Sequence, residues 1–344
     1  MRAIRTWGAI ALGLLLPILS ANGQAAKAPK SATVAFYNVE NLFDTENDPK
    51  VNDDEFTPTG ANLWTLDRYA AKLKNLASVI GQIGDGKGGF PVAVGLAEVE
   101  NRKVVEDLIA TSPLSDAKYG IVHFDSPDLR GIDVALIYLK NRFKPVRTYA
   151  VPFVNADDPT FKTRDVLVVS GKLDGELVHF VVNHWPSRRG GDESAILRGG
   201  AASNTRSAVD AILKKDPKAK VIVMGDLNDN PTDESLLKEL KAKGTTNGLA
   251  KDELYNPMVS LFESGIGTLP YKGAWNLFDQ FIVTQGFLNA AKGFKFDYAK
   301  VYSPEFLKEK EGKYAGNPYR TYAGKKYLGG YSDHFPVYMT ISRK

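Results

Sequence analysis

The chain has 344 residues, of which 43% are hydrophobic and none is cysteine. The lack of cysteine excludes disulfides and thiolate metal sites, so the fold must rely on a hydrophobic core. There are 44 lysines and arginines against 40 acidic residues. This near balance indicates no particular binding partner and does not favour a polyanionic one.

The first predicted element is a signal peptide over residues 1–23. Arg2 and Arg5 precede the apolar run 9–19, and small residues follow at positions 20, 21 and 23. This pattern is typical of a secretory signal peptide, and the run is too short to span a bilayer comfortably. We therefore expect an exported protein, periplasmic or extracellular. Removing Arg2 and Arg5 lowers the basic count from 44 to 42, against 40 acids.

Short runs rich in β-branched and aromatic residues predict strands along the rest of the chain. They cover residues 33–37, 92–96, 132–139, 166–170, 178–182, 220–224, 280–284 and 336–341. Apolar residues at three-to-four spacing predict helices over 66–83, 104–110, 194–213 and 234–241. Some strands follow each other without a helix, which favours hairpins and mixed sheets. No repeat or linker divides residues 30–344, so a single domain is expected.

Two loops stand out by composition. Residues 44–62 are acidic but lack the glycine that an EF-hand needs at its sixth position, so we interpret them as a solvated loop. Residues 313–331 are rich in tyrosine, glycine and basic side chains, and they lead into the sequence GYSDHFPV at 330–337. The second loop has two interpretations, a platform for stacked bases or a sugar phosphate, and a tyrosine-packed structural loop.

Polar side chains stand at the ends or starts of several predicted strands. A charged group there costs little free energy only if it is solvated or paired, and each one alone is common in turns and caps. A mixed sheet can bring several strand ends to one edge, so together they predict a single cleft. The set comprises Asn38, Glu98, His184, Asp226, Asn228, Asp279, Asp333 and His334.

The donor types in this set point to a chemistry. Carboxylate and amide oxygens without thiolates suit Mg²⁺ first, then Mn²⁺ or Ca²⁺. Zinc is disfavoured because the chain has four histidines, and we interpret His123 and His179 as structural. An oxygen-ligated cation with two histidines indicates phosphate ester hydrolysis, and Arg130 and Arg164 at strand starts are candidates for binding the phosphate.

Eight motifs, taken in their order along the chain, indicate a family resemblance. FYNVENLFD, GLAEVEN, RGIDVALIY, TRDVLVV, VVNHWPSRRGG, VIVMGDLNDNP, FDQFIV and YSDHFPV occur in this order within residues 33–341. The order resembles the endonuclease/exonuclease/phosphatase superfamily, the group of pancreatic deoxyribonuclease, exonuclease III-like repair enzymes, sphingomyelinases and inositol polyphosphate 5-phosphatases. The resemblance implies an α+β fold, a four-layer αββα sandwich of two mixed β-sheets flanked by helices. It also implies that the site lies at the strand ends.

The resemblance implies a role for each candidate residue. The implied metal ligands are Asn38, Glu98 and Asp333, and the implied catalytic residues are His184, Asp226, Asn228, Asp279 and His334. In such proteins the GDxN pair orients water and contacts phosphate, and one histidine, oriented by an aspartate, touches the scissile phosphate. Here His334 with Asp279 would fill that second role. His184 would be the second histidine, with Asp133 as its partner, and Arg130 and Arg164 would bind the substrate.

Two positions depart from the family pattern. Ala97 stands where many relatives have glutamine before the metal-binding glutamate, so one polar contact near the metal is missing. Glu100 stands where the deoxyribonuclease-like branch carries an arginine. An acid at this place could repel a phosphate backbone, which weakens the case for double-stranded DNA.

The sequence thus predicts a divalent-metal-dependent phosphodiesterase or nuclease. Its expected partner is a phosphate-ester substrate such as DNA or RNA, and its expected state is a monomer without a membrane span. The alternatives are a lipid or sugar phosphate esterase of the same fold, and an exported binding protein without catalysis. A dinuclear metallophosphatase is disfavoured because it would need a GNH motif and more histidines.

Overall fold

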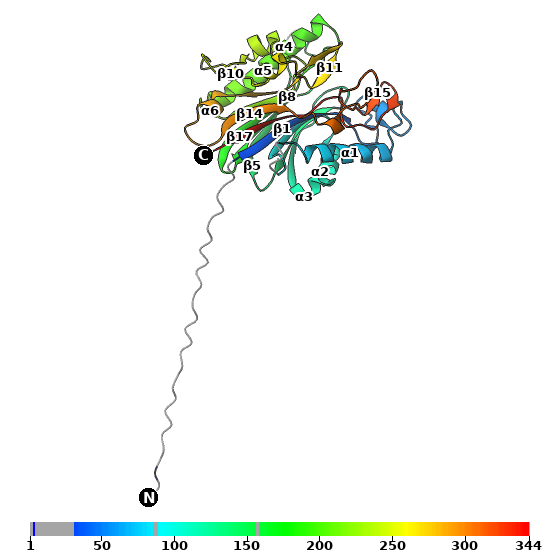
Figure 1. Ribbon diagram of the computed structural model, residues 1–344, viewed down its shortest axis with the longest axis horizontal. Coiled ribbons are helices and arrows are strands. Elements are labelled where there is room, and N and C mark those ends of the chain that lie inside the picture. The colour runs from blue at the N-terminus through cyan, green and yellow to red at the C-terminus, as the bar shows by residue number, and fades with distance from the viewer. Residues whose placement is uncertain (1–2, 4–30, 85–88, 156–157, 344) are drawn as a thin grey trace.

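Two β-sheets pack face to face between two layers of helices (Figure 1). The computed structural model describes residue 3 and residues 31–84, 89–155 and 158–343, so all of the predicted signal peptide except Ala3 lies outside the described residues. The four-layer αββα sandwich of two mixed sheets that the sequence predicts is confirmed. Across the described ranges, no helix is both long and apolar enough to pass through a membrane.

The first sheet is mixed. Within the described residues it has six strands in the order β14-β17-β1-β2-β4-β3. Their bounds are β1 (Ser31–Leu42), β2 (Ala93–Val99), β3 (Tyr119–His123), β4 (Asp133–Leu139), β14 (Lys295–Val301) and β17 (Val337–Ser342). The central pair β1 and β2 is parallel, whereas β17 and β4 lie antiparallel to them.

The second sheet is also mixed, and its described part has seven strands in the order β5-β6-β7-β8-β13-β10-β9. Their bounds are β5 (Phe143–Val151), β6 (Val166–Leu173), β7 (Glu176–His184), β8 (Val221–Asp226), β9 (Ala242–Lys243), β10 (Leu254–Tyr255) and β13 (Asp279–Val283). β7 and β8 are parallel, and β6 and β7 form the hairpin expected from the sequence. Two small hairpins join β11 (Leu269–Tyr271) to β12 (Ala274–Asn276), and β15 (Tyr322–Ala323) to β16 (Lys326–Tyr327).

The helices cover the outer faces of the sheets (Figure 1). The first layer has α1 (Leu66–Ile80), α2 (Arg102–Ala110) and α3 (Leu114–Ala117), and α4 (Asp192–Leu213) covers the second sheet. α5 (Met258–Glu263) contacts β13 and β14, one strand of each sheet, and α6 (Gln285–Leu288) contacts β14. Short helices η1 (Asp54–Phe56), η2 (Ser235–Glu239) and η3 (Glu305–Leu307) lie in connections. α1 begins where the Thr65 hydroxyl accepts the backbone N–H of Arg68, and α2 begins where Asn101 accepts that of Val104.

The strand register explains why the polar strand ends meet. In the parallel pairs, Asn38 lies opposite Ala97, next to Glu98, and His184 lies opposite Asp226. β13 runs antiparallel to β8 and places its first residue, Asp279, beside Asp226. β17 runs antiparallel to β1, so the segment before Val337, which holds Asp333 and His334, also lies at this end. One end of the sandwich therefore collects residues from six segments.

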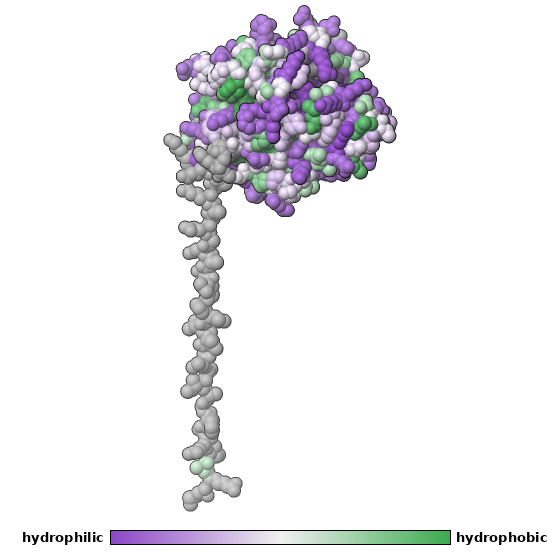
Figure 2. Space-filling view, turned by 45° about the vertical axis from the view of Figure 1, so that its right-hand side comes forward, coloured by the Kyte–Doolittle hydropathy of each residue, from purple (hydrophilic) through white to green (hydrophobic). Residues whose placement is uncertain are grey.

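The two sheets approach each other closely at Gly95 of β2. A Cβ atom there would lie 3.0 Å from Met224 Sδ of β8 and 3.2 Å from Val182 Cγ1 of β7. A larger side chain would therefore push the sheets apart, since packed interiors have little free volume. Outside this core, the face shown in Figure 2 is mainly hydrophilic, with apolar residues in small separate patches.

His179 of β7 gives a prediction for stability that is separate from the site. Burial lowers the pKa of His179 below its ordinary value of 6.5, and its Nδ1 atom lies 2.7 Å from Ser170 Oγ. As the pH falls from 6.5, the unfolded chain takes up this proton before the folded chain does, so stability falls. His179→Gln should reduce the loss of stability between about pH 7 and pH 5. Urea midpoints at both pH values test this, and an unchanged pH dependence would contradict it.

Candidate active site

The strand ends line a cleft of about 450 Å³. Its walls include eight of the predicted site residues, namely Glu98, Arg130, Arg164, His184, Asp226, Asn228, Asp333 and His334. Asn38 and Asp279 lie directly behind them, each hydrogen-bonded to a residue of the wall. A larger groove of about 930 Å³ beside α4 is lined by none of the predicted site residues.

Asn38 joins two carboxylates at the centre of the site. Its Nδ2 atom donates to Glu98 Oε1 at 3.2 Å and to Asp226 Oδ2 at 3.0 Å. The backbone N–H of Asn41 holds the second oxygen of Glu98 at 3.0 Å. Glu98 has a φ of +64°, in a region that is strained for a side chain other than glycine. Such strain costs roughly 1–3 kcal/mol and is concentrated at functional sites.

His334 forms a charged pair with Asp279. Its Nδ1 atom lies 2.7 Å from Asp279 Oδ2, and its Nε2 atom lies 3.8 Å from Asp226 Oδ2. Burial alone would lower the pKa of His334, but the carboxylates of Asp279 and Asp226 outweigh burial and raise it well above 6.5. His334 is therefore an imidazolium near neutral pH, with Nε2 facing the cleft centre.

His184 is the opposite case. Its Nε2 atom lies 3.7 Å from Asp226 Oδ2 and 3.9 Å from Glu98 Oε1. Burial, together with the cation of Arg164, lowers the pKa of His184 well below 6.5, so this imidazole is neutral. Its Nδ1 atom is buried and has no hydrogen-bond partner among the described residues. The cleft thus holds a charged imidazole on one side of Asp226 and a neutral imidazole on the other. Burial raises the pKa of Asp226 itself to about 7.

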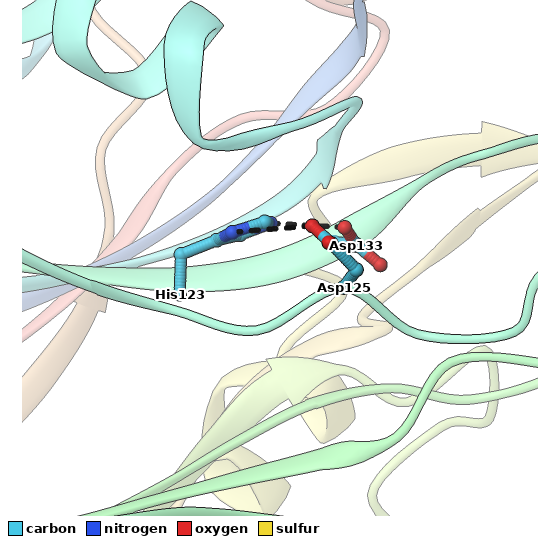
Figure 3. Close-up of side chains that lie close together, drawn as sticks. All are labelled: His123, Asp125 and Asp133. Atoms are coloured by element: carbon cyan, nitrogen blue, oxygen red, sulfur yellow. Dashed lines mark hydrogen bonds and ion pairs between the residues drawn. The ribbon is translucent and has the colours of Figure 1, made fainter. Parts of the chain in front are cut away.

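The predicted partnership of Asp133 with His184 is wrong. Asp133 Oδ2 lies 2.9 Å from His123 Nε2, and its Oδ1 accepts the backbone N–H and the hydroxyl of Ser126. Figure 3 shows the carboxylates of Asp133 and Asp125 together on one side of the His123 ring. β4 starts at Asp133 on the far side of the loop that returns from β3, so its side chain meets that loop and not the cleft. The pair anchors the loop that carries Asp128 and Arg130.

Arg164 lines the cleft but is largely engaged by the protein. Its guanidinium donates to the backbone carbonyls of His184 at 3.2 Å and Trp185 at 2.6 Å, and to Asp128 Oδ2 at 2.8 Å. Of its five N–H groups, three are used in this way, so its main contact is with the segment that carries His184. Arg130 is exposed at the rim, with Asp128 as its nearest carboxylate at 3.6 Å.

The GDLN segment has a fixed shape. The backbone N–H of Asn228 donates to Asp226 Oδ1 at 3.0 Å, and its side-chain amide donates to the carbonyl of Trp185 at 3.0 Å. Asn228 has a φ of +52°, another strained position. Arg188 holds the segment from the side through the carbonyl of Asn228 at 2.8 Å and the carboxylate of Asp229 at 2.9 Å. This support by Arg188 could not be read from the sequence, because it depends on contacts between residues 40 positions apart.

Other residues play parts that the sequence left open or did not show. The loop 313–331 contributes no residue to the described cleft lining; it packs near α1, where Arg68 lies over Tyr327 and Tyr322 donates to the carbonyl of Asn62. The structural interpretation of this loop is thus the better one.

Glu100 faces away from the cleft and accepts the backbone N–H of Asp44 at 2.6 Å. Phe161, Lys162, Arg189 and Tyr271 also line the cleft.

Residues 33–343 match the model of the Endonuclease/Exonuclease/phosphatase family. The chain belongs to this family. Enzymes of the family hydrolyse phosphoric esters and use divalent metal ions, so this chain is a phosphoric ester hydrolase by class. No curated protein matches it in sequence.

Solved structures of family members share the fold at low identity. The human Nocturnin catalytic domain with bound sulfate is 17% identical with a TM-score of 0.54, and the match covers 91% of this chain and 95% of that one. Zebrafish (D. rerio) TDP2 complexed with a single-strand DNA product is 16% identical at 0.54, covering 91% and 99%. A family protein from Bacteroides thetaiotaomicron is 17% identical at 0.54, covering 92% and 99%. At these identities the likeness shows the fold alone.

Proposed function

We propose that this protein is an exported, divalent-metal-dependent phosphodiesterase that cuts single-stranded nucleic acid. The observation that carries the proposal is a set of close contacts in one cleft with a cationic rim. Nε2 of His184 lies less than 4 Å from Glu98 and from Asp226, and Nε2 of His334 lies less than 4 Å from Asp226. Export rests on the signal-peptide pattern at residues 1–23.

The donor set fits a hard divalent cation. Glu98 and Asp333 present partly exposed carboxylates to the cleft, with side-chain exposures of 15% and 30%, and Asn38 lies against Glu98. Glu98 and Asp333 would hold Mg²⁺ or Mn²⁺, with Ca²⁺ as a weaker candidate, because their carboxylate oxygens are hard donors. Asn38, predicted as a third ligand, turns its Nδ2 atom toward Glu98 and its Oδ1 atom toward the N–H of Glu40, so it would orient Glu98. When bound, the cation would neutralise charge on the phosphate and its leaving oxygen.

The two imidazoles divide the remaining work. The charged Nε2–H of His334 can donate to a phosphate oxygen and stabilise the charge that develops there. Asp279 keeps this ring oriented through its bond to Nδ1. Asp226 accepts hydrogen bonds from Asn38 and Asn228 and lies between both rings, where it can orient a water molecule and take its proton.

The residues at the cleft rim favour a single strand of nucleic acid as the substrate. Lys162 and Arg189 line the cleft, are exposed and form no ion pair within the described part of the chain. Their charges can bind phosphates on either side of the one that is cut. Phe161 and Tyr271 add partly exposed aromatic rings, which can stack on unpaired bases. One structural neighbour, zebrafish TDP2, is itself complexed with a single-strand DNA product.

A substrate panel tests this function. The mature protein is incubated with single-stranded DNA, RNA, a sphingomyelin vesicle and bis(p-nitrophenyl) phosphate, each with Mg²⁺, Mn²⁺, Ca²⁺ or EDTA. We expect the protein to cleave single-stranded DNA and RNA. EDTA should stop the cleavage, Mg²⁺ or Mn²⁺ should restore it, and added salt should slow it because salt weakens binding to the phosphates. Cleavage that survives EDTA, or that is confined to the lipid, would contradict the proposal. Tight binding without cleavage would indicate the binding-protein alternative.

A further inference from the structure

Lys72 is a buried cation behind the cleft, in a place where a lysine is costly. It lies on α1 among the buried residues Tyr69, Leu73 and Leu76, and its side chain is 1% exposed. Burial lowers the pKa of this ammonium, since a low-dielectric environment disfavours charge. A buried charge is retained only with good partners, so its contacts indicate what it does.

The ammonium of Lys72 is held by three groups from two distant segments. Its Nζ atom donates to the hydroxyl of Thr321 and to the carbonyl of Tyr331, both at 2.7 Å. The carboxylate of Glu40 lies 3.7 Å away, and the same oxygen of Glu40 accepts the backbone N–H of Thr321 at 2.7 Å. Lys72 therefore ties the end of β1 to the segment before β17.

One tied segment carries Asn38, which holds the proposed ligand Glu98, and the other carries the proposed ligand Asp333. Glu40 lies two residues after Asn38, and its N–H donates to Asn38 Oδ1 at 3.0 Å. Tyr331 lies two residues before Asp333, and Ser332 between them donates to the carbonyl of Asn38 at 2.7 Å. The spacing between Asn38 and Asp333 is thus fixed by the hydrogen bond of Ser332 and, from behind, by the ammonium group of Lys72.

A neighbour on the same helix reinforces this role. Asn75, one turn further along α1, donates to the carbonyls of Gly329 and Gly330 at 3.0 and 2.9 Å. Gly330 is itself in close contact, because a Cβ atom there would lie 2.1 Å from the carbonyl oxygen of Tyr319. The segment before Asp333 is therefore packed between α1 and the preceding loop with no room to shift.

We infer that Lys72 is a positioning residue for the metal site, which sets the affinity for the divalent cation by fixing Asn38 and Asp333 relative to each other. The inference rests on the proposed function for the identity of the ligands. It goes further in assigning a role to a helix residue that touches neither substrate nor metal. Groups that orient metal ligands in this way commonly change metal affinity by about 10- to 100-fold when they are replaced.

Mn²⁺ binding without substrate tests the inference, because the free ion is counted directly by electron paramagnetic resonance. We expect Lys72→Met to raise the Mn²⁺ dissociation constant by about tenfold or more. The double variant Lys72→Met with Glu40→Gln removes both charges and keeps the net charge, and it should bind as weakly as the single variant. Lys74→Met, an exposed lysine of the same helix, is the matched control and should bind like the wild type. Saturating Mn²⁺ should restore most of the kcat of Lys72→Met.

The outcomes are distinguishable. Wild-type affinity in a folded Lys72→Met variant, or in the double variant, would overturn the inference, since the hydrogen bonds to Tyr331 and Thr321 would then be dispensable. A wild-type protein that binds no Mn²⁺ would overturn the proposed function and the inference together. If circular dichroism shows that Lys72→Met is unfolded, Asn75→Ala takes its place. It should weaken Mn²⁺ binding in the same direction by about threefold or more, and unchanged binding would count against the role.

Discussion

His334→Ala should lower kcat on a phosphodiester by about 100- to 10,000-fold, the range that a positioned acid or base contributes. The variant loses the imidazolium that Asp279 and Asp226 keep charged, so the phosphate loses a charged donor at the cleft centre. The measurement is single-turnover cleavage of bis(p-nitrophenyl) phosphate at saturating Mg²⁺. Circular dichroism should stay unchanged, because the fold is held by the sheets and not by this ring.

Another histidine provides the control for this prediction. His179 lies in the middle of β7 against Ser170, outside the cleft lining. His179→Gln should keep wild-type kcat. If His334→Ala retained full activity, or if both variants lost it equally, the assignment of His334 as the phosphate-contacting residue would be rejected.

Asp226→Asn should lower kcat by about 100-fold or more while it increases stability. The carboxylate accepts from Asn38 and Asn228 and lies within 3.8 Å of both imidazoles, so an amide removes the charge on which the arrangement depends. Burial raises the pKa of Asp226 from 3.8 to about 7, which means that the ionised form costs folding free energy. The folded state holds this proton more tightly, so stability falls as the pH rises from 3.8 through about 7.

Activity and stability should therefore move in opposite directions in this variant. Urea midpoints at about pH 8 in EDTA should be higher for Asp226→Asn than for the wild type. Asp252→Asn, which removes an exposed carboxylate paired with Lys241, should change neither quantity. A lower urea midpoint together with wild-type kcat would show that Asp226 is a structural residue.

The sequence predicted the central strands because their apolar runs are uninterrupted. The eight predicted strands all fall on β1, β2, β4, β6, β7, β8, β13 and β17. β3, β5 and β14 escaped prediction, and each lies at an edge of its sheet. Edge strands are partly exposed and carry polar residues, such as Lys144 and Arg147 in β5, so their hydrophobic pattern is weak.

The grouping of the site could be predicted, but some pairings inside it could not. Strand order brings Asn38, Glu98 and Asp226 together, and each stands at the end of an apolar run that the sequence shows. The pair His123 and Asp133 depends on how a loop folds back, which no periodicity reports. Lys72 did leave a signal, a charge on the apolar stripe of a helix, which indicates a buried and paired lysine.

The most direct test of the site is a crystal structure of the protein with Mn²⁺, in which anomalous scattering locates the ion. Two groups of described residues have donor atoms close enough for a cation, Asp226 with Asp279 and His334, and His123 with Asp125 and Asp133. The proposed function predicts a peak in the cleft, about 2.0–2.5 Å from a carboxylate oxygen of Glu98. A peak only beside His123, or none at saturating Mn²⁺, would contradict it.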